Sequence, residues 1–154
     1  MALGIFGRSK VPRQSPWRDS DRDRPRVLIE HHGVAESEVV ARILGEAGYV
    51  VATCEGPDAS HGTACTMSKT GDCSLVDEAD LVYHGLRVSD EVNREVLASI
   101  RRRYPDTPVI VEAAGPTLER YAEELEGFTT VAFPATSAGI LRAVEAELGA
   151  APAP

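Results

Sequence analysis

The sequence predicts an α/β protein built on a parallel sheet, because residues 79–114 have the pattern of a strand, a helix and a second strand. Leu81–Tyr83 and Val109–Val111 are short apolar runs of the kind that form buried strands. Between them, Ser89 is the expected N-cap of a helix and Pro105 its stop. The apolar residues of that helix recur with helical spacing: Val92, Val96, Leu97 and Ile100. Two strands joined by a helix lie parallel with a right-handed crossover, so both faces of the sheet need helices.

The chain before this unit predicts a strand, a helix and a second strand. Arg26–Glu30 contains a buried apolar run, and residues 35–47 carry apolar side chains with helical spacing. Gly48 is well placed to end that helix, because glycine readily adopts the left-handed conformation that closes many helices. Tyr49–Thr53 is expected to form the second strand.

The chain after the unit predicts one more helix, strand and helix. Pro116 suits the first turn of a helix. The apolar face of that helix is expected to be Leu118, Tyr121, Ala122 and Leu125. Thr129–Phe133 is the expected fifth strand, and the last helix is expected to be capped by Thr136 or Ser137 and closed by Gly149.

Residues 54–78 interrupt this alternation. Glycine, serine, threonine and aspartate are scattered through them without an apolar stripe. We therefore expect a long, cysteine-containing loop with at most one helical turn in place of the second helix. Connections of this length without secondary structure are usually functional or mobile.

Composition favours one domain with a flexible extension at each end. A chain of 154 residues, 43% of them hydrophobic, can bury one sizeable core. Residues 1–25 are expected to be a disordered basic arm, residues 26–149 the folded domain and residues 150–154 a disordered tail. Met1–Arg26 carries seven basic and three acidic residues, a net +4, whereas the whole chain carries -8. The few apolar residues of the arm make at most a marginal anchor to a partner or a membrane surface: Leu3, Ile5, Phe6 and Trp17.

The charge and the apolar pattern also exclude several classes of partner. A folded part with a net charge of -12 argues against nucleic acid as its ligand. The sequence contains neither a signal peptide nor a membrane-spanning apolar stretch, so we expect a cytoplasmic protein with no membrane partner. Three cysteines in a reducing compartment argue against a disulfide framework.

Three stretches resemble the receiver domain of two-component response regulators. ADLVYHGLR resembles the third strand of that family, RRRYPDTPVIVEAA the end of its third helix and its fourth strand, and VAFPATSAGILRAV its fifth strand and last helix. The resemblance covers about Arg26–Gly149. It implies a flavodoxin-like, doubly wound sheet of five parallel strands in the order 2-1-3-4-5.

The residues by which a receiver works are replaced at every position that the resemblance identifies. His31 and His32 stand where the family has an acidic pair that holds magnesium, and Gly85 stands where it has the phosphorylated aspartate. Ala113 replaces the hydroxyl residue after the fourth strand, and Phe133 replaces the lysine before Pro134. The resemblance therefore implies a pseudo-receiver, which is neither phosphorylated nor an enzyme and which needs no cofactor.

The cysteines leave three interpretations open. Cys54, Cys65 and Cys73 have a spacing that matches no standard zinc or iron-sulfur motif. They are expected near the carboxyl edge of the sheet, where His84 or His31 is a candidate fourth ligand of a zinc ion or an iron-sulfur cluster. The second interpretation is a redox pair of Cys65 with Cys73. The third is purely structural, with Cys54 as a small core residue.

These observations predict a regulatory module of two-component signalling that binds a protein partner or a second copy of itself. The expected surface is the one that receivers commonly use, formed by the helix after Pro116, the fifth strand and the last helix. Leu118, Tyr121 and Phe133 are the candidate contact residues, with core packing as the alternative for each. The alternative function is a metal-binding or thiol-redox sensor that uses the cysteines.

Overall fold

A computed structural model of the chain describes residues 15–18, 22–57 and 65–150. Its strands form one sheet, which consists of β1 (Arg26–Glu30), β2 (Val50–Cys54), β3 (Leu81–His84), β4 (Val109–Ala114) and β5 (Thr129–Phe133). All neighbouring strands are parallel, and their order is β2-β1-β3-β4-β5. The predicted doubly wound, flavodoxin-like sheet is confirmed.

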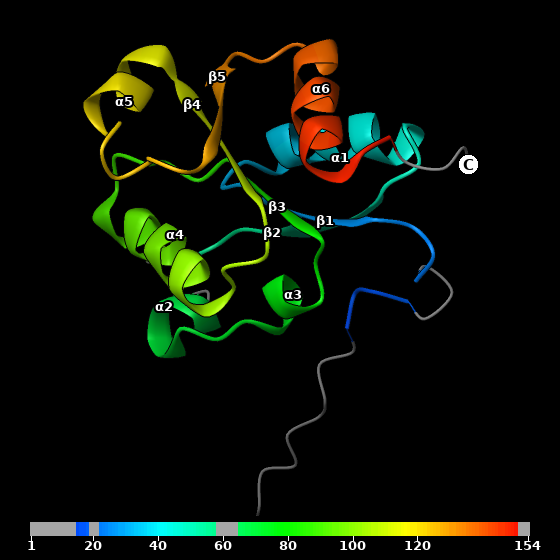
Figure 1. Cartoon of the computed structure of the whole chain (residues 1–154), viewed down its shortest axis with the longest axis horizontal. Coiled ribbons are helices and arrows are strands. Elements are labelled where there is room, and N and C mark those ends of the chain that lie inside the picture. The colour runs from blue at the N-terminus through cyan, green and yellow to red at the C-terminus, as the bar shows by residue number, and fades with distance from the viewer. Residues whose placement is uncertain (1–14, 19–21, 58–64, 151–154) are drawn as a thin grey trace, which may run out of the picture.

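The helices lie in two layers, one on each face of the sheet (Figure 1). α1 (Val34–Glu46) and α6 (Ser137–Leu148) cover one face. α2 (Thr66–Thr70), α3 (Ser74–Asp77) and α4 (Glu91–Arg103) cover the other, and α5 (Gly115–Arg120) lies beside β4 and β5. No helix in the described part of the chain is long and apolar enough to cross a membrane.

Alternating strand residues build two separate cores. Leu28 and Val82 point toward α4, whereas Val27 and Ile29 point toward α1 and α6. All four are fully buried. Because successive side chains of a strand face opposite sides, a sheet covered on both faces needs continuous apolar runs, and these runs are what the sequence contains.

The predicted helix caps at Gly48 and Thr136 are confirmed, whereas the one at Ser89 is not. Gly48 follows α1 with a φ of 98°, and the Thr136 hydroxyl accepts a hydrogen bond of 3.0 Å from the amide of Gly139 at the start of α6. The helix predicted to begin after Ser89 begins after Asp90 instead. The Asp90 carbonyl accepts the first bonds of α4, from the amides of Asn93 and Arg94.

The prediction of at most one helical turn in residues 54–78 was wrong. Two short helices form there, α2 and α3. Each buries one apolar side chain in the core between the sheet and α4. The buried residue of α2 is Met67, at 2% exposure, and that of α3 is Val76, at 0%. Gly71, with a φ of 76°, ends α2. A single buried residue per helix produces no apolar stripe, so the pattern could not show these helices.

The helix predicted after Pro116 is shorter than its apolar spacing suggested. α5 ends at Arg120, and hydrogen-bonded turns continue to Gly127. Leu125 is buried all the same, at 4% exposure. A chain of turns presents an apolar residue to the core as well as a helix does, so the spacing alone could not distinguish them.

Trp17 corrects the prediction of a fully disordered arm. Its side chain is 6% exposed and belongs to the core on the α2, α3 and α4 face. The Arg26 guanidinium lies 5.8 Å from the centre of its ring. Trp17 is therefore not available to a partner. The other expectations for residues 1–14, 19–21 and 151–154 lie outside the described residues.

Candidate functional site

A crevice of about 380 Å³ opens at the carboxyl ends of β3, β4 and β5. Four of the five positions singled out by the receiver resemblance line it: His31, Gly85, Ala113 and Phe133. Its wall is completed by Glu36, Leu86, Arg87, Val88, Ser89, Glu112, Ala114 and Thr117. Crevices at this edge are where doubly wound sheets bind ligands, because the strand order reverses there between β1 and β3.

His32 lies apart from this crevice. Its Nε2 is 3.1 Å from the Nδ2 of Asn93, which is fully buried in α4. The same Nδ2 donates a hydrogen bond of 2.9 Å to the carbonyl of Arg87. His32 therefore links the loop after β1 to α4 and the loop before it.

The His31 ring lies against the place where a side chain of residue 85 would begin. A Cβ atom added at Gly85 would lie 2.4 Å from the Cδ2 of His31, a separation that real Cβ atoms do not show. The His31 Nδ1 accepts a hydrogen bond of 3.0 Å from the amide of Gly33, so the neutral ring carries its proton on Nε2. The hydrogen bond to Gly33 holds the ring in this position, so a larger residue at position 85 would require the ring to move.

A buried polar layer, which the sequence pattern did not predict, lies beneath the crevice. The His84 Nδ1 lies 2.6 Å from a carboxylate oxygen of Glu30, and both residues are buried. The Tyr83 hydroxyl donates a hydrogen bond of 2.8 Å to Glu112. The sequence contained a sign of this layer. The apolar runs of β1, β3 and β4 are each followed directly by an ionisable residue, which is Glu30, His84 and Glu112 respectively.

Tyr83 is held in its protonated form by these surroundings. Burial, followed by the negative charge of Glu112 and the hydrogen bond to it, raises the pKa of Tyr83 far above its usual value. Its hydroxyl is therefore a fixed donor to Glu112 and not a proton donor for chemistry near neutral pH.

His84, a candidate fourth metal ligand in the sequence, pairs with a carboxylate in the structure. Its Nδ1 is engaged by Glu30, and its Nε2 is buried without a hydrogen-bond partner. The sheet register places the two residues opposite each other on β1 and β3. His84 is therefore a partner for a buried carboxylate in the core of the sheet.

The three cysteines pack against the same core, on the α2, α3 and α4 face of the sheet, but the structure does not arrange them as a metal site. Cys54 ends β2, Cys65 precedes α2 and Cys73 precedes α3, and all three thiols are free. Within the described ranges, no group of three or more histidine, cysteine, aspartate or glutamate side chains is placed to hold a metal ion. The predicted zinc or iron-sulfur site on these cysteines, with His84 or His31 as fourth ligand, is not supported.

Burial makes Cys54 a poor thiolate. Burial raises the pKa of the Cys54 thiol to about 11. The hydrogen bond from the amide of Gly56 lowers this pKa. The negative charge of Glu30 and the neighbouring thiols of Cys65 and Cys73 raise it by smaller amounts. Cys65 and Cys73 are thus close enough to Cys54 to influence its ionisation. His61, which the sequence places in the same loop, lies outside the described residues.

Comparisons with known proteins identify the fold. No protein family and no curated protein matches the sequence significantly. Among solved structures, the Vibrio cholerae chemotaxis protein CheY4 is 15% identical, with a TM-score of 0.58 over 80% of this chain and 98% of that one. The receiver domain of NtrX from Brucella abortus is 17% identical, with a TM-score of 0.56 over 80% of this chain and 97% of that one.

A third solved structure belongs to redox sensors of the streptococci that evolved from two-component response regulators. It is 12% identical, with a TM-score of 0.59, and the match covers 79% of this chain and 50% of that one. At identities this low, the three matches establish the fold and leave the chemistry to the site itself. The chain therefore has the flavodoxin-like fold of response-regulator receiver domains. Its crevice at the carboxyl edge of the sheet is lined by His31, Gly85, Ala113 and Phe133.

Proposed function

We propose that this chain is a pseudo-receiver, a regulatory module that keeps the receiver shape, is not phosphorylated and acts by binding a protein partner. One observation carries the proposal. Residue 85 is a glycine with a histidine ring packed where its side chain would begin, so the position that receivers use to accept a phosphoryl group has neither the oxygen nor the room for it.

The charges of the crevice support the same conclusion. Glu36 and Glu112 line it, and the cation that also lines it, Arg87, lies 3.3 Å from the carboxylate of Asp90. A phosphoryl group needs cations and hydrogen-bond donors around its oxygens. This crevice has donors in Ser89 and Thr117, but Phe133 stands where receivers have a lysine and Gly85 where they have the phosphorylated aspartate. Neutral imidazoles are also poor ligands for magnesium, which prefers oxygen.

Treatment with a small phosphodonor tests the absence of phosphorylation. Intact-mass spectrometry after incubation with acetyl phosphate and Mg²⁺ is expected to show no gain of a phosphoryl group. A receiver domain that retains its aspartate, treated in the same way, shows that the donor is active. A magnesium-dependent gain in mass on an aspartate of this chain would contradict the proposal.

The surface formed by α5, β5 and α6 is the proposed partner surface. Phe133, at the end of the edge strand β5, is 54% exposed, which is unusual for a phenylalanine. Leu118 and Tyr121 are half-buried and pack against the core. Much of their surface therefore serves core packing and is not available to a partner. Phe133 is therefore the residue with which to test this surface.

A matched pair of substitutions tests the partner surface. Phe133→Ser is expected to abolish capture of the partner from the native cell, while Val34→Ser leaves it unchanged. Val34 is 58% exposed and lies on α1, away from β5. Size-exclusion chromatography of the purified chain distinguishes a second copy from a different protein as the partner. Equal capture by both variants would contradict this assignment of the surface.

A thiol-redox sensor is the second candidate function. It is favoured by three free thiols that pack against one core, with Cys65 and Cys73 near enough to Cys54 to contribute to its raised pKa. A fold match to redox sensors that evolved from response regulators agrees with it. Because Cys54 stays protonated at neutral pH, the attacking thiolate would be supplied by Cys65 or Cys73. Two thiols and one hydrogen peroxide molecule would then give one disulfide and two water molecules.

Peroxide treatment distinguishes the two candidates. A sensor is expected to lose two hydrogen atoms per disulfide in intact-mass spectra, with recovery by a reductant and loss of the change in Cys65→Ser or Cys73→Ser. If the three thiols stay reduced under conditions that oxidise a control dithiol, the redox candidate fails and the pseudo-receiver proposal is unaffected.

A further inference from the structure

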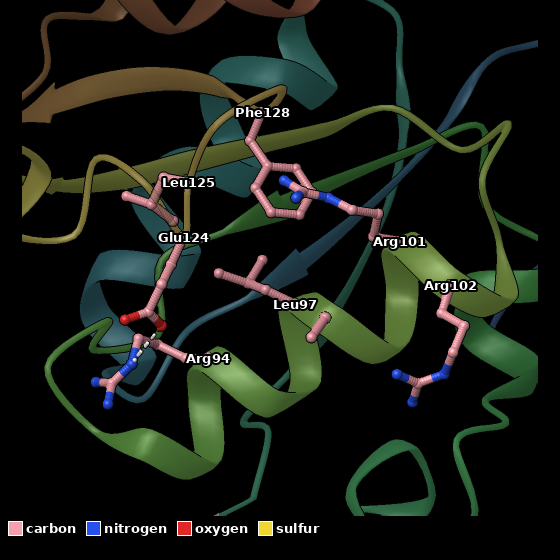
Figure 2. A pocket seen from close by; sticks show the side chains of 8 residues that line it. Arg94, Leu97, Arg101, Arg102, Glu124, Leu125 and Phe128 are labelled. Atoms are coloured by element: carbon pink, nitrogen blue, oxygen red, sulfur yellow. Dashed lines mark ion pairs between the residues drawn. The ribbon is translucent and has the colours of Figure 1, made fainter.

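A second cavity, distinct from the crevice at the sheet edge, lies between α4 and the turns that follow α5. Its volume is about 390 Å³. Its apolar lining is Leu97, Ala98, Leu125 and Phe128, and its charged lining is Arg94, Arg101, Arg102 and Glu124. Figure 2 shows Arg94 paired with Glu124 at one side, the Arg101 guanidinium laid across the Phe128 ring at the other, and Leu97 between the two pairs. We call this cavity the arginine groove.

The apolar floor of the arginine groove is preformed. Leu97 and Leu125 are 2% and 4% exposed, so their positions are set by the core. Phe128 is half-buried, and the Arg101 guanidinium lies 3.9 Å from the centre of its ring. That stacking holds the Arg101 guanidinium at the rim of the groove. Because the side chain is already ordered, less conformational entropy is lost when a ligand binds it.

The arginines of the groove differ in how they are neutralised. Arg94 lies 2.9 Å from Glu124, stacks 4.5 Å from the Tyr121 ring and donates to the carbonyls of Val88 and Ser89. Arg101 and Arg102 form no ion pair with any described acidic residue. Arg101 donates to the Glu126 carbonyl, and Arg102 donates a long bond of 3.4 Å to the Ser99 hydroxyl.

Arg101 and Arg102 present two guanidinium groups without an ion-pair partner among the described acidic residues, in a chain whose net charge is -8. Guanidinium groups recognise carboxylates with paired hydrogen bonds. The cavity beside them, floored by Leu97 and Leu125, has room for one bulky apolar side chain. The complementary ligand therefore combines an apolar anchor with flanking carboxylates.

We infer that the arginine groove binds an acidic peptide segment of a partner protein, with one bulky apolar side chain in the cavity and carboxylates on Arg101 and Arg102. The inference rests on the proposed function, because it names the chemistry of the partner. The chain's own first fourteen residues are a poor occupant, since they carry Arg8, Lys10 and Arg13 and no acidic residue. Two copies of a strongly acidic domain repel each other, which disfavours self-association.

Peptide binding measured by fluorescence anisotropy tests the inference. The probe is a fluorescein-labelled synthetic peptide with a central leucine flanked by glutamates, added to the full chain. Arg101→Glu/Arg102→Glu is expected to weaken binding by at least about tenfold. Ala98→Trp, a substitution of an exposed residue that fills the cavity without changing charge, is expected to weaken it comparably.

Two controls make the result specific. Arg42→Glu removes an exposed arginine on α1, on the opposite face of the sheet, and is expected to leave the affinity within about twofold. A probe with serine in place of leucine, which keeps the glutamates, is expected to bind at least about tenfold more weakly. Circular dichroism establishes that each variant is folded.

Several outcomes would overturn the inference. One is that Arg42→Glu weakens peptide binding as much as the double variant does. Another is that the leucine and serine probes bind equally well. The third is that the unmodified chain shows no saturable binding of the leucine probe. If the probe fails while Phe133→Ser still abolishes partner capture, only the arginine groove is refuted. A magnesium-dependent phosphorylation would instead refute the proposed function.

Discussion

At the scale of single residues, His31 and Gly85 depend on each other. The ring of His31 is held by the amide of Gly33, and a Cβ at residue 85 would collide with it. Gly85 does not have a positive φ, so the backbone itself would accept a larger residue. Side-chain packing therefore explains the glycine, and backbone conformation does not.

The first prediction follows from this contact. Gly85→Ala is expected to lower the free energy of unfolding by about 1–3 kcal/mol, because overpacking forces the ring to move. In a His31→Ala background, the same substitution is expected to cost less than about 0.5 kcal/mol. Urea unfolding of the four proteins measures the cycle. Gly45→Ala is the matched control, since a Cβ there meets nothing within 4 Å. Equal costs in the two backgrounds would refute the contact.

The second prediction concerns Cys54 and alkaline pH. Its folded-state pKa of about 11 lies above that of an unfolded cysteine, so the folded state retains the proton that the unfolded state loses. The stabilisation is present below pH about 9 and disappears as the pH rises to about 11. The raised pKa of Tyr83 acts with the same sign at higher pH.

Cys54→Ser removes this titration and is therefore expected to flatten the alkaline loss of stability. From pH about 8 to pH about 11, the parent should lose up to about 2–3 kcal/mol more unfolding free energy than the variant does. Urea unfolding at a series of pH values measures it, with Cys73→Ser as a comparison. A constant difference across this range would show that Cys54 ionises normally in the folded state.

At the scale of elements, α2 and α3 show how a helix forms without an amphipathic pattern. Their buried residues, Met67 and Val76, pack into the core that α4 and the sheet form. The Tyr104 hydroxyl accepts a hydrogen bond of 3.0 Å from the amide of Cys73, at the start of α3. Tertiary contacts of this kind override weak local preference, because packing supplies most of the stability of short helices.

The third prediction concerns the segment before β1. A chain that begins at residue 26 lacks Trp17, whose side chain completes the core beneath α3 and beside Arg26. It is expected to be less stable by about 3 kcal/mol, the typical cost of removing a buried tryptophan. Trp17→Ala in the full chain should reproduce most of the loss, whereas a chain that begins at residue 15 should not show it. Thermal unfolding compares them. Equal stability of the chains beginning at 15 and 26 would contradict the packing of Trp17.

At the scale of the whole molecule, the fold separates surfaces of different charge. The crevice at the carboxyl edge presents Glu36 and Glu112 beside Phe133, and the arginine groove lies between α4 and the turns after α5. The two sites lie on different parts of one receiver-type fold. The proposed regulatory function and the proposed binding of an acidic peptide therefore depend on separate surfaces, which substitutions can test independently.

The fourth prediction concerns metal ions and the stability of the whole fold. Dialysis against EDTA is expected to leave the melting temperature unchanged, because Glu30 engages His84 and the described cysteines form no ligand cluster. Calorimetry before and after chelation measures it, with a zinc-binding protein as a control for the chelator. A lower melting temperature that added zinc restores would revive the metal alternative for Cys54, Cys65 and Cys73.

The sequence by itself determined the order along the chain of the five strands and of α1, α4, α5 and α6, but it did not show α2 and α3. Continuous apolar runs such as Val27–Ile29 specify buried parallel strands, and Gly48 and Thr136 terminate helices by local hydrogen bonding and backbone conformation. These signals act within a few residues of one another. They can therefore be recognised without knowing what lies across the sheet.

Only the tertiary structure decided which distant groups meet. The contact of the His31 ring with Gly85, the pairing of Glu30 with His84 and the burial of Trp17 join residues that lie far apart in the chain. The same holds for the arginine groove, where α4 meets the turns after α5. Strand register and helix placement set these distances, and no local pattern encodes them. The physical reason is that a buried polar group or ring is stabilised by a specific neighbour in space, whatever its separation in sequence.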